Sequence, residues 1–151
     1  MSQGGIYLLI ALLTAHTQQV NTERAERTCL AEALYYEARG EGERGQEAVA
    51  EVILDRRRSG IHPDSICGVV YEPHQFSFVE DGSMLGKRDQ DAWVAANQLA
   101  ARIMSGEIVT SMTRKATFYH QVSIQPNWAK TLVRTAQIGN HIFYQPRPQK
   151  S

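Results

Sequence analysis

Apolar residues recur at helical spacing in three blocks of the chain. These blocks cover residues 23–39, 43–58 and 89–105, and a glycine follows each of them within two positions. In the third block, for example, Leu99 and Ile103 repeat at the four-residue step that places side chains on one helix face. Glycine just beyond such a block is a typical helix stop. The pattern therefore predicts three amphipathic helices, each with one buried face.

Alternation of apolar and polar residues predicts short strands. Residues 75–79 and 116–122 alternate, and residues 142–144 follow a Gly139-Asn140 turn signal. The helical blocks precede most of these strands, and no βαβ alternation occurs. We therefore predict an α+β fold, with a helical lobe and a small antiparallel β-sheet.

The two ends of the chain differ from the middle. Residues 6–13 form an apolar run that is too short to span a bilayer. Its length fits an export signal, although no Lys or Arg precedes it, and the alternative is a first helix packed on the core. We expect residues 1–22 to form this separate N-terminal segment, residues 23–145 one domain, and residues 146–151 a loose tail. Membrane contact is expected only through the N-terminal segment.

Composition narrows the classes of partner. The chain has 151 residues, with 16 basic and 16 acidic side chains, so it fits one domain without a net charge that would attract nucleic acid. A neutral polymer such as a glycan fits this balance, and we expect a monomer. Five scattered histidines without HExxH spacing predict no metal site, and no cofactor motif is present. Cys29 and Cys67 either form one bridge or are two small buried side chains.

One carboxyl group stands out because it shares an apolar helix face. Leu30, Leu34 and Glu37 lie on one stripe of the first block. Burial raises a carboxyl pKa, which is what a general acid needs near neutral pH. Glu37 is therefore the candidate general acid/base, and the alternative is a structural ion pair or a helix-end carboxylate. Glu32 is interpreted as an ordinary surface charge.

A second carboxylate cannot be chosen from the sequence. Glu41 follows the Gly40 helix stop, and we expect it to cap the next helix or to pair with Arg44. Glu80 and Asp81 also remain open as partners, because glycosidase pairs are defined by a distance between carboxyl groups.

Aromatic and polar residues form a second candidate group. Sugar rings bind where aromatic faces lie beside hydrogen-bonding side chains. Tyr119 and His120 are neighbours in a predicted strand and should point to opposite faces. We expect Tyr119 to contact substrate, Phe118 to lie on the core side, and His120 to be a partly buried support. The candidate substrate-binding residues are Tyr36, Gln75, Phe76, Ser77, Tyr119, His120, Trp128 and His141.

These motifs resemble the SleB/CwlJ family of cell wall hydrolases, known from spore cortex lysis. The resemblance implies a lysozyme-like α+β domain with Glu37 as acid/base and peptidoglycan glycan strands as partner. It further implies a lytic transglycosylase, which cleaves the MurNAc–GlcNAc β-1,4 bond and leaves 1,6-anhydro-MurNAc ends. The matching blocks, in family order, are residues 29–57 with the EARGE motif, 62–78, 116–120, 126–128 and 138–144.

Departures from the family pattern leave other questions open. Many similar chains carry cysteines where His74 and Glu80 stand, and Asp55 replaces an Asn. The rival functions are a true hydrolase of the same strand and a non-catalytic glycan-binding accessory protein. The expected location is the periplasm or cell envelope. The alternative is a phage endolysin, which would lie in the host cytoplasm before its release.

Overall fold

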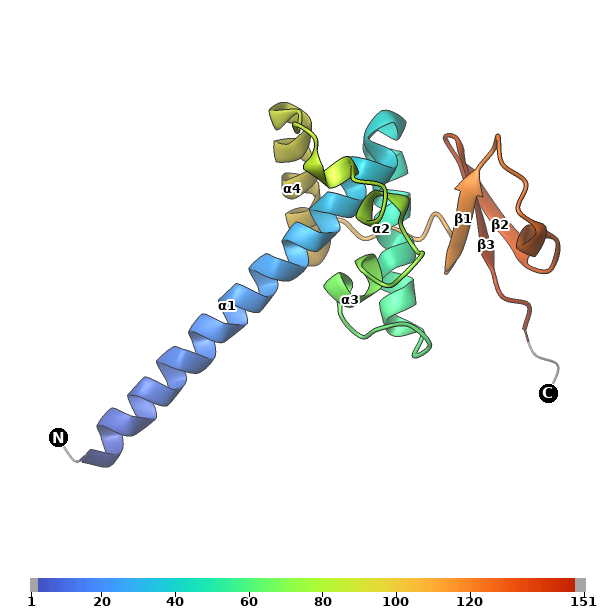
Figure 1. The fold of residues 1–151 in the computed structure, drawn as a ribbon. Coiled ribbons are helices and arrows are strands. Elements are labelled where there is room, and N and C mark those ends of the chain that lie inside the picture. The colour runs from blue at the N-terminus through green and yellow to red at the C-terminus, as the bar shows by residue number, and fades with distance from the viewer. Residues whose placement is uncertain (1–2, 149–151) are drawn as a thin grey trace.

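The computed structural model describes residues 3–148. Four α-helices come first and a three-stranded sheet follows, so the predicted α+β order is confirmed (Figure 1). Four short 3₁₀ helices lie between these elements: η1 (Arg39–Glu41), η2 (Ser77–Val79), η3 (Ser83–Leu85) and η4 (Asn127–Lys130). The helices are α1 (Gln3–Ala38), α2 (Gly42–Arg58), α3 (Ile66–Val70) and α4 (Gln90–Met104), and the strands are β1 (Phe118–Gln121), β2 (Val133–Ile138) and β3 (His141–Gln145).

The helical lobe is built on the apolar stripes that the sequence predicts. Leu30 and Leu34 of α1, Ile53 of α2 and Leu99 of α4 are all buried in one core. The Asp89 side chain begins α4 by accepting a hydrogen bond from the Ala92 backbone amide at 3.0 Å. All three predicted helices are present, the first as the C-terminal part of the longer α1.

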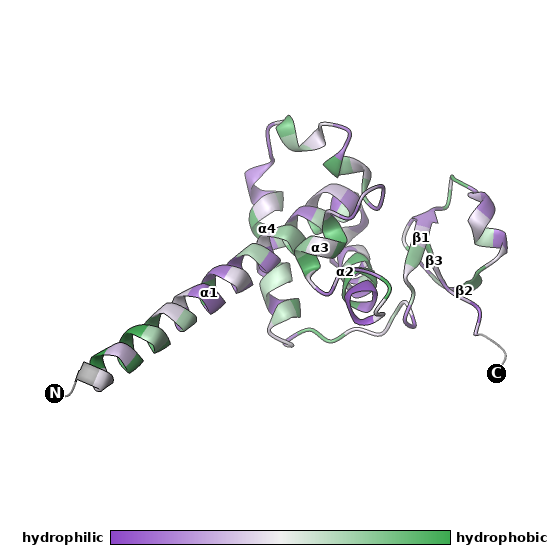
Figure 2. Ribbon diagram, turned by 60° about the horizontal axis from the view of Figure 1, so that its bottom comes forward, coloured by the Kyte–Doolittle hydropathy of each residue, from purple (hydrophilic) through white to green (hydrophobic). Residues whose placement is uncertain are grey.

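The N-terminal part of α1 projects away from this core. Residues 4–25 are exposed, and the large apolar side chains between Ile6 and Leu13 are 47–71% exposed. Figure 2 shows this apolar run at the far end of the helix. The segment is helical and does not pack on the core, and its role as an export signal or as a first helix stays a prediction. Within residues 3–148, no helix has an apolar stretch long enough to cross a membrane.

A disulfide joins the buried part of α1 to α3. Cys29 and Cys67 are bonded, with Cα atoms 5.2 Å apart, which decides the alternatives that the sequence left open. The short helix α3 was not predicted from the sequence. Its N-cap is Ser65, whose hydroxyl accepts a hydrogen bond from the Gly68 amide at 2.9 Å.

The sheet has the order β1-β3-β2, and both pairs are antiparallel. β1 and β3 match the two later predicted strands, whereas β2 was not predicted and carries a β-bulge between Arg134 and Ala136. The predicted strand 75–79 is wrong, because Ser77–Val79 forms the 3₁₀ helix η2. Phe76 and Phe78 are both buried in the helical core. Their alternation with polar residues therefore reflects a short turn with two buried side chains and not a strand.

Glu41 connects the helical lobe to the sheet. It accepts hydrogen bonds from the Asn140 backbone amide at 2.8 Å and from the Asn140 side-chain amide at 3.1 Å. Gly139 precedes Asn140 with φ +54°, and a Cβ there would lie 2.2 Å from a Glu41 carboxylate oxygen. Glu41 occupies the N-cap position of α2, as expected, but its side chain makes no capping hydrogen bond there and, among the described residues, no ion pair with Arg44. The carboxylate instead holds the β2–β3 turn.

Candidate active site

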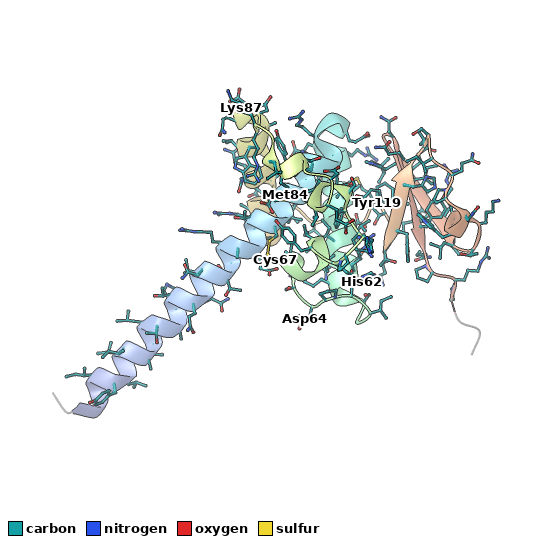
Figure 3. The ribbon with its side chains drawn as sticks, viewed as in Figure 1. His62, Asp64, Cys67, Met84, Lys87 and Tyr119 are labelled. Atoms are coloured by element: carbon teal, nitrogen blue, oxygen red, sulfur yellow. A yellow bond between two sulfur atoms is a disulfide. The ribbon has the colours of Figure 1, made fainter. Side chains whose placement is uncertain are left out.

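Glu37 lies one residue before the end of α1, where the helix meets the sheet. Its side chain is partly buried, and its carboxylate accepts a 3.1 Å hydrogen bond from the Tyr119 hydroxyl of β1. Figure 3 shows Tyr119 between the helical lobe and the sheet. Leu30 and Leu34 fix the rotation of α1 because both are fully buried. The same stripe therefore directs Glu37 toward β1.

The surroundings of Glu37 favour its protonated form. Burial removes water from the carboxyl group and raises its pKa, and the negative charge of Asp81 acts in the same direction. The Tyr119 hydrogen bond and the positive charge of Arg56 oppose the shift, because each stabilises the carboxylate. The pKa remains raised overall. Such a group can hold a proton and can also be stabilised once the proton has left.

Arg56 is a site residue that the sequence analysis missed. It lies on α2, is 5% exposed, and donates through Nε to the Thr117 carbonyl oxygen at 2.8 Å. Its guanidinium carbon lies 5.5 Å from the centre of the Phe76 ring. The buried Nη1 has no hydrogen-bond partner among the described residues. The sequence signal that could have identified Arg56 is its position at the end of residues 48–56, where most of the neighbouring residues are apolar and predicted to be buried.

Glu37 and Arg56 line a cleft of about 480 Å³ between the helical lobe and the sheet. Most of the predicted substrate-binding residues surround this cleft. His74, Glu80, Gln121 and Ile124 also contribute to its walls. The predicted residues that line it are Gln75, Phe76, Ser77, Tyr119, His120 and His141.

The β1 and β3 side chains alternate between the two faces of the sheet. Tyr119 packs on the helix-facing side, edge-on to His141 at 5.0 Å and beside Phe143 at 5.6 Å between ring centres. His141 is 2% exposed, and burial lowers its pKa. Its ring therefore favours the neutral form, which can accept as well as donate a hydrogen bond.

The opposite face of the sheet carries a second aromatic group. The Phe118 and His120 rings each lie 5.6 Å from Trp128, and His120 also bonds the Tyr144 hydroxyl at 3.0 Å. The expectation that Phe118 lies on the core side is wrong, because Tyr119 occupies that side. His120 nevertheless reaches the cleft, so both neighbours line it. Trp128 packs within this group and is absent from the cleft lining.

Tyr36 lies on the other side of Glu37. Its ring stacks on Phe78 at 4.9 Å, and its hydroxyl accepts a hydrogen bond from Arg88 at 3.1 Å. Arg88 also pairs with Glu32 at 3.3 Å. Glu32 is 7% exposed and accepts a hydrogen bond from Tyr71. The interpretation of Glu32 as an ordinary surface charge is therefore wrong.

The remaining carboxylates near the cleft are held by local contacts. Glu80 accepts a hydrogen bond from the His74 backbone amide at 3.0 Å and contacts the His74 ring at 3.2 Å. These contacts lower the Glu80 pKa. Hydrogen bonds from Ser83 lower the Asp81 pKa in the same way. Both groups are thus ionised more readily than Glu37, which separates them chemically from the candidate acid.

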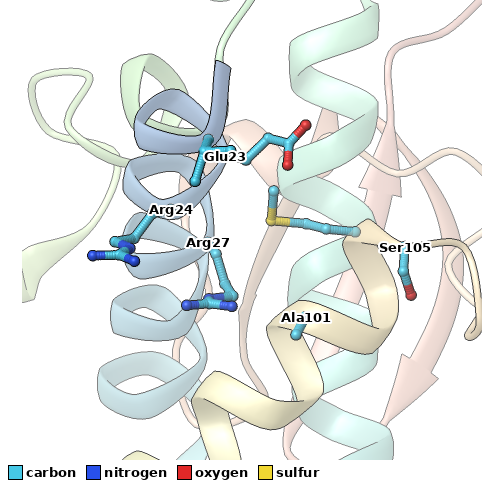
Figure 4. Close-up of a pocket in the computed structure, with 7 residues that line it drawn as sticks. Glu23, Arg24, Arg27, Ala101 and Ser105 are labelled. Carbon is cyan, nitrogen blue, oxygen red and sulfur yellow. The ribbon is translucent and has the colours of Figure 1, made fainter. Parts of the chain in front are cut away.

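Other site types have less support. Across residues 3–148, no group of three His, Cys, Asp or Glu side chains is placed to hold a metal ion. A cavity of about 490 Å³ lies between α1 and α4, and its lining includes Glu23, Arg24, Arg27, Ala101 and Ser105 (Figure 4). It contains none of the candidate residues. The chemistry therefore points to the cleft at Glu37, which is similar in volume.

A family model described as Cell Wall Hydrolase matches residues 40–144. The chain belongs to this family. The match begins just after Glu37 and includes Arg56, Tyr119 and His141. The resemblance predicted from the motifs is therefore confirmed at the level of the family.

Spore cortex-lytic enzymes are among its relatives. The enzyme of Bacillus subtilis is 46% identical over 117 residues, which cover 76% of this chain and 35% of that protein. The enzyme of Oceanobacillus iheyensis is 36% identical over 116 residues, covering 76% of this chain and 39% of that protein. The chain thus spans little more than a third of the length of these relatives.

Solved structures share the fold. The catalytic domain of the germination-specific lytic transglycosylase SleB from Bacillus anthracis superposes with a TM-score of 0.66 at 31% identity, covering 80% of this chain and 93% of that domain. The SleB catalytic domain from Bacillus cereus gives a TM-score of 0.64 at 31% identity, covering 81% and 91%. The expected lysozyme-like α+β fold is therefore confirmed.

Proposed function

We propose that this protein is a lytic transglycosylase that cleaves the MurNAc–GlcNAc β-1,4 bond of peptidoglycan glycan strands. The observation that carries the proposal is the Glu37 carboxyl group, which is partly buried on the wall of a 480 Å³ cleft and has a raised pKa. The likeness to a SleB catalytic domain described as a lytic transglycosylase supports the same activity.

Glu37 acts first as the acid. Its protonated carboxyl group donates a proton to the glycosidic oxygen while the bond lengthens toward an oxocarbenium-like state. Burial supports this step because it keeps the proton on Glu37 at a pH where an exposed glutamate is ionised. The leaving sugar departs with the proton, and Glu37 becomes a carboxylate.

Glu37 then acts as the base. Its carboxylate removes the proton from the C6 hydroxyl of the muramic sugar, whose oxygen attacks C1 of the same ring and closes the 1,6-anhydro bridge. The attack is intramolecular and benefits from proximity. The Tyr119 hydroxyl and the positive charge of Arg56 stabilise the carboxylate between the two steps. No nucleophilic carboxylate is required.

The residues around the cleft hold the strand. Gln75, Ser77, His120 and His141 bond sugar hydroxyl and amide groups, and the Tyr119 ring offers an apolar face. Tyr36 contacts the strand on the other side of Glu37. Trp128 does not contact the strand directly; its ring packs against the His120 ring and holds it in position.

Analysis of digestion products tests the proposal. Purified peptidoglycan is incubated with the wild type, Glu37→Gln and Glu41→Gln, and the fragments are identified by mass spectrometry. We expect 1,6-anhydro ends from the wild type and a loss of at least about 10²-fold in rate for Glu37→Gln. Glu41→Gln should cost less, because Glu41 holds a turn. A Glu37 variant that keeps more than about a tenth of the turnover contradicts the assignment.

The same experiment distinguishes the rival functions. Reducing ends instead of anhydro ends identify a hydrolase, in which water replaces the C6 hydroxyl. Strand binding without turnover in the wild type identifies a glycan-binding accessory protein. We also propose that residues 23–145 form the domain that carries the site, and that the protein acts in the periplasm or cell envelope. The Cys29–Cys67 disulfide supports an oxidising location.

A further inference from the structure

The cleft has a neighbouring cavity on the other side of Glu37. This cavity has a volume of about 410 Å³, and Glu37 lines both spaces. We call it the cationic pocket, since the exposed side chains of Arg39 and Lys87 contribute to its wall; its lining residues are Tyr35, Tyr36, Glu37, Arg39, Gly40 and Lys87. A polymer whose reacting bond lies at Glu37 would extend into the cleft on one side and into the cationic pocket on the other.

The two positive charges of this pocket are not neutralised by an ion pair. Arg39 donates a 2.8 Å hydrogen bond to the uncharged Tyr35 hydroxyl and lies 5.0 Å from the centre of that ring. The neighbouring Arg88, by contrast, is paired with Glu32. Among the ion pairs within residues 3–148, none includes Arg39 or Lys87. Figure 3 shows Lys87 at the top of the helical lobe.

Peptidoglycan carries its negative charge at defined places. The sugar rings themselves are neutral, and carboxylates belong to the substituent on O3 of the muramic sugar. They come from the lactyl group where that substituent is bare and from the peptide stem where it is intact. A guanidinium group matches a carboxylate in geometry, and a lysine ammonium group adds a mobile point charge. Sugar hydroxyl groups alone would not need two unpaired cations.

We infer that the cationic pocket binds a carboxylate on the O3 substituent of a muramic sugar beside the bond cleaved at Glu37. The inference rests on the proposed function and adds a specificity to it. Strands that carry carboxylates should be better substrates than strands of the same sugars without them. Arg39 is held in place by Tyr35, so its charge needs little ordering when the substrate binds. Lys87 is exposed and should add a charge that salt screens.

Chemically matched strands test the inference. Peptide-bearing strands and amidase-treated strands, which expose the lactyl carboxylate, are each compared with a sample whose carboxylates have been converted to amides. The rate constant kcat/KM is measured for the wild type and Lys87→Gln. Lys130→Gln is the matched control, because Lys130 is an exposed lysine on η4 and is not part of either cavity lining. Thermal melting verifies that each variant is folded.

The expected result is a preference of the wild type for free carboxylates of about two- to fivefold, the size of an exposed ion pair. Lys87→Gln should reduce this preference, and Lys130→Gln should keep it. A preference on peptide-bearing strands identifies the stem as the source, and one on amidase-treated strands identifies the lactyl group. Equal rates on free and amidated strands, or an unchanged preference in Lys87→Gln, overturn the inference while leaving the proposed function intact. Failure of the wild type to cleave any strand overturns both.

Discussion

The Tyr119 hydroxyl donates a hydrogen bond to the Glu37 carboxylate across 82 positions of sequence. The donor belongs to the first strand of the sheet and the acceptor to the last turn of the first helix. The phenol favours the charged form of a carboxyl group that burial would otherwise keep neutral. The balance between these two influences leads to predictions for pH dependence.

Replacing Glu37 by Gln should raise stability at neutral pH. A glutamate in the unfolded chain titrates near 4.5, whereas burial raises the pKa of Glu37 in the folded protein. The native state therefore binds more protons between these two values, and wild-type stability falls as pH rises through the folded pKa. Below pH 4.5 the Glu37 carboxyl group is protonated in the folded and in the unfolded chain, so its titration no longer changes the stability. Thermal melting of wild type and Glu37→Gln across a pH series measures the effect.

Glu80→Gln is the matched control for this series. Contacts with His74 lower the Glu80 pKa, so its ionised form is favoured in the folded state. Its replacement should lower stability above the unfolded pKa, which is the opposite sign. A Glu37→Gln variant that melts below the wild type at all pH values would contradict the desolvation argument.

Tyr119→Phe should move the pH dependence of activity while leaving the fold intact. Without the phenol, the carboxylate of Glu37 loses a donor and its pKa rises further. The decline of kcat/KM on the alkaline side should therefore shift to higher pH, and turnover should fall because the base step loses support. Tyr144→Phe is the control, since the Tyr144 hydroxyl bonds His120 instead. An unshifted profile in Tyr119→Phe would exclude this coupling.

Removing the disulfide should destabilise the helical lobe. The Cys29–Cys67 bridge spans 38 positions of sequence and joins α1 to α3. Loss of a native bridge of this kind typically costs about 2–5 kcal/mol. We expect Cys29→Ala/Cys67→Ala to show a lower unfolding midpoint in denaturant than the oxidised wild type, and reduced wild type should resemble the variant. Two reactive thiols in the unreduced wild type would show that the bridge is absent.

The His74–Glu80 contact should be replaceable by a covalent bond. The two side chains approach to 3.2 Å at the rim of the cleft, and the family resemblance predicts a pair of cysteines at these positions. His74→Cys/Glu80→Cys should therefore form a second disulfide under oxidising conditions, detectable as a mass decrease of two hydrogens per bridge. The gain in stability should disappear on reduction. Persistent free thiols after oxidation would mean that the backbone at these positions cannot close the bridge.

The sequence predicts parts of this structure that depend on local patterns. Leu30, Leu34 and Glu37 share one face of an α-helix, so their spacing predicted that the candidate acid lies on the buried face. Glu32 and Glu41 were misinterpreted because their partners lie far away in sequence, at Arg88 and Asn140. The role of Arg56 was missed for the same reason, as its bond to the Thr117 carbonyl oxygen depends on tertiary packing. The local hydrophobic pattern predicts which face of a helix is buried, but it does not predict which residue, distant in the sequence, contacts that face.

The Glu41–Asn140 contact has a consequence for the order of folding. It joins residues 99 positions apart, and the Glu37–Tyr119 bond is nearly as long in sequence. Closing such loops carries an entropic cost that local helix formation does not. We therefore expect the helices to collapse first and the hairpin to dock afterwards. A chain still emerging from the ribosome would have a folded helical lobe but half a cleft, and it could not cut a wall until its last strand had arrived.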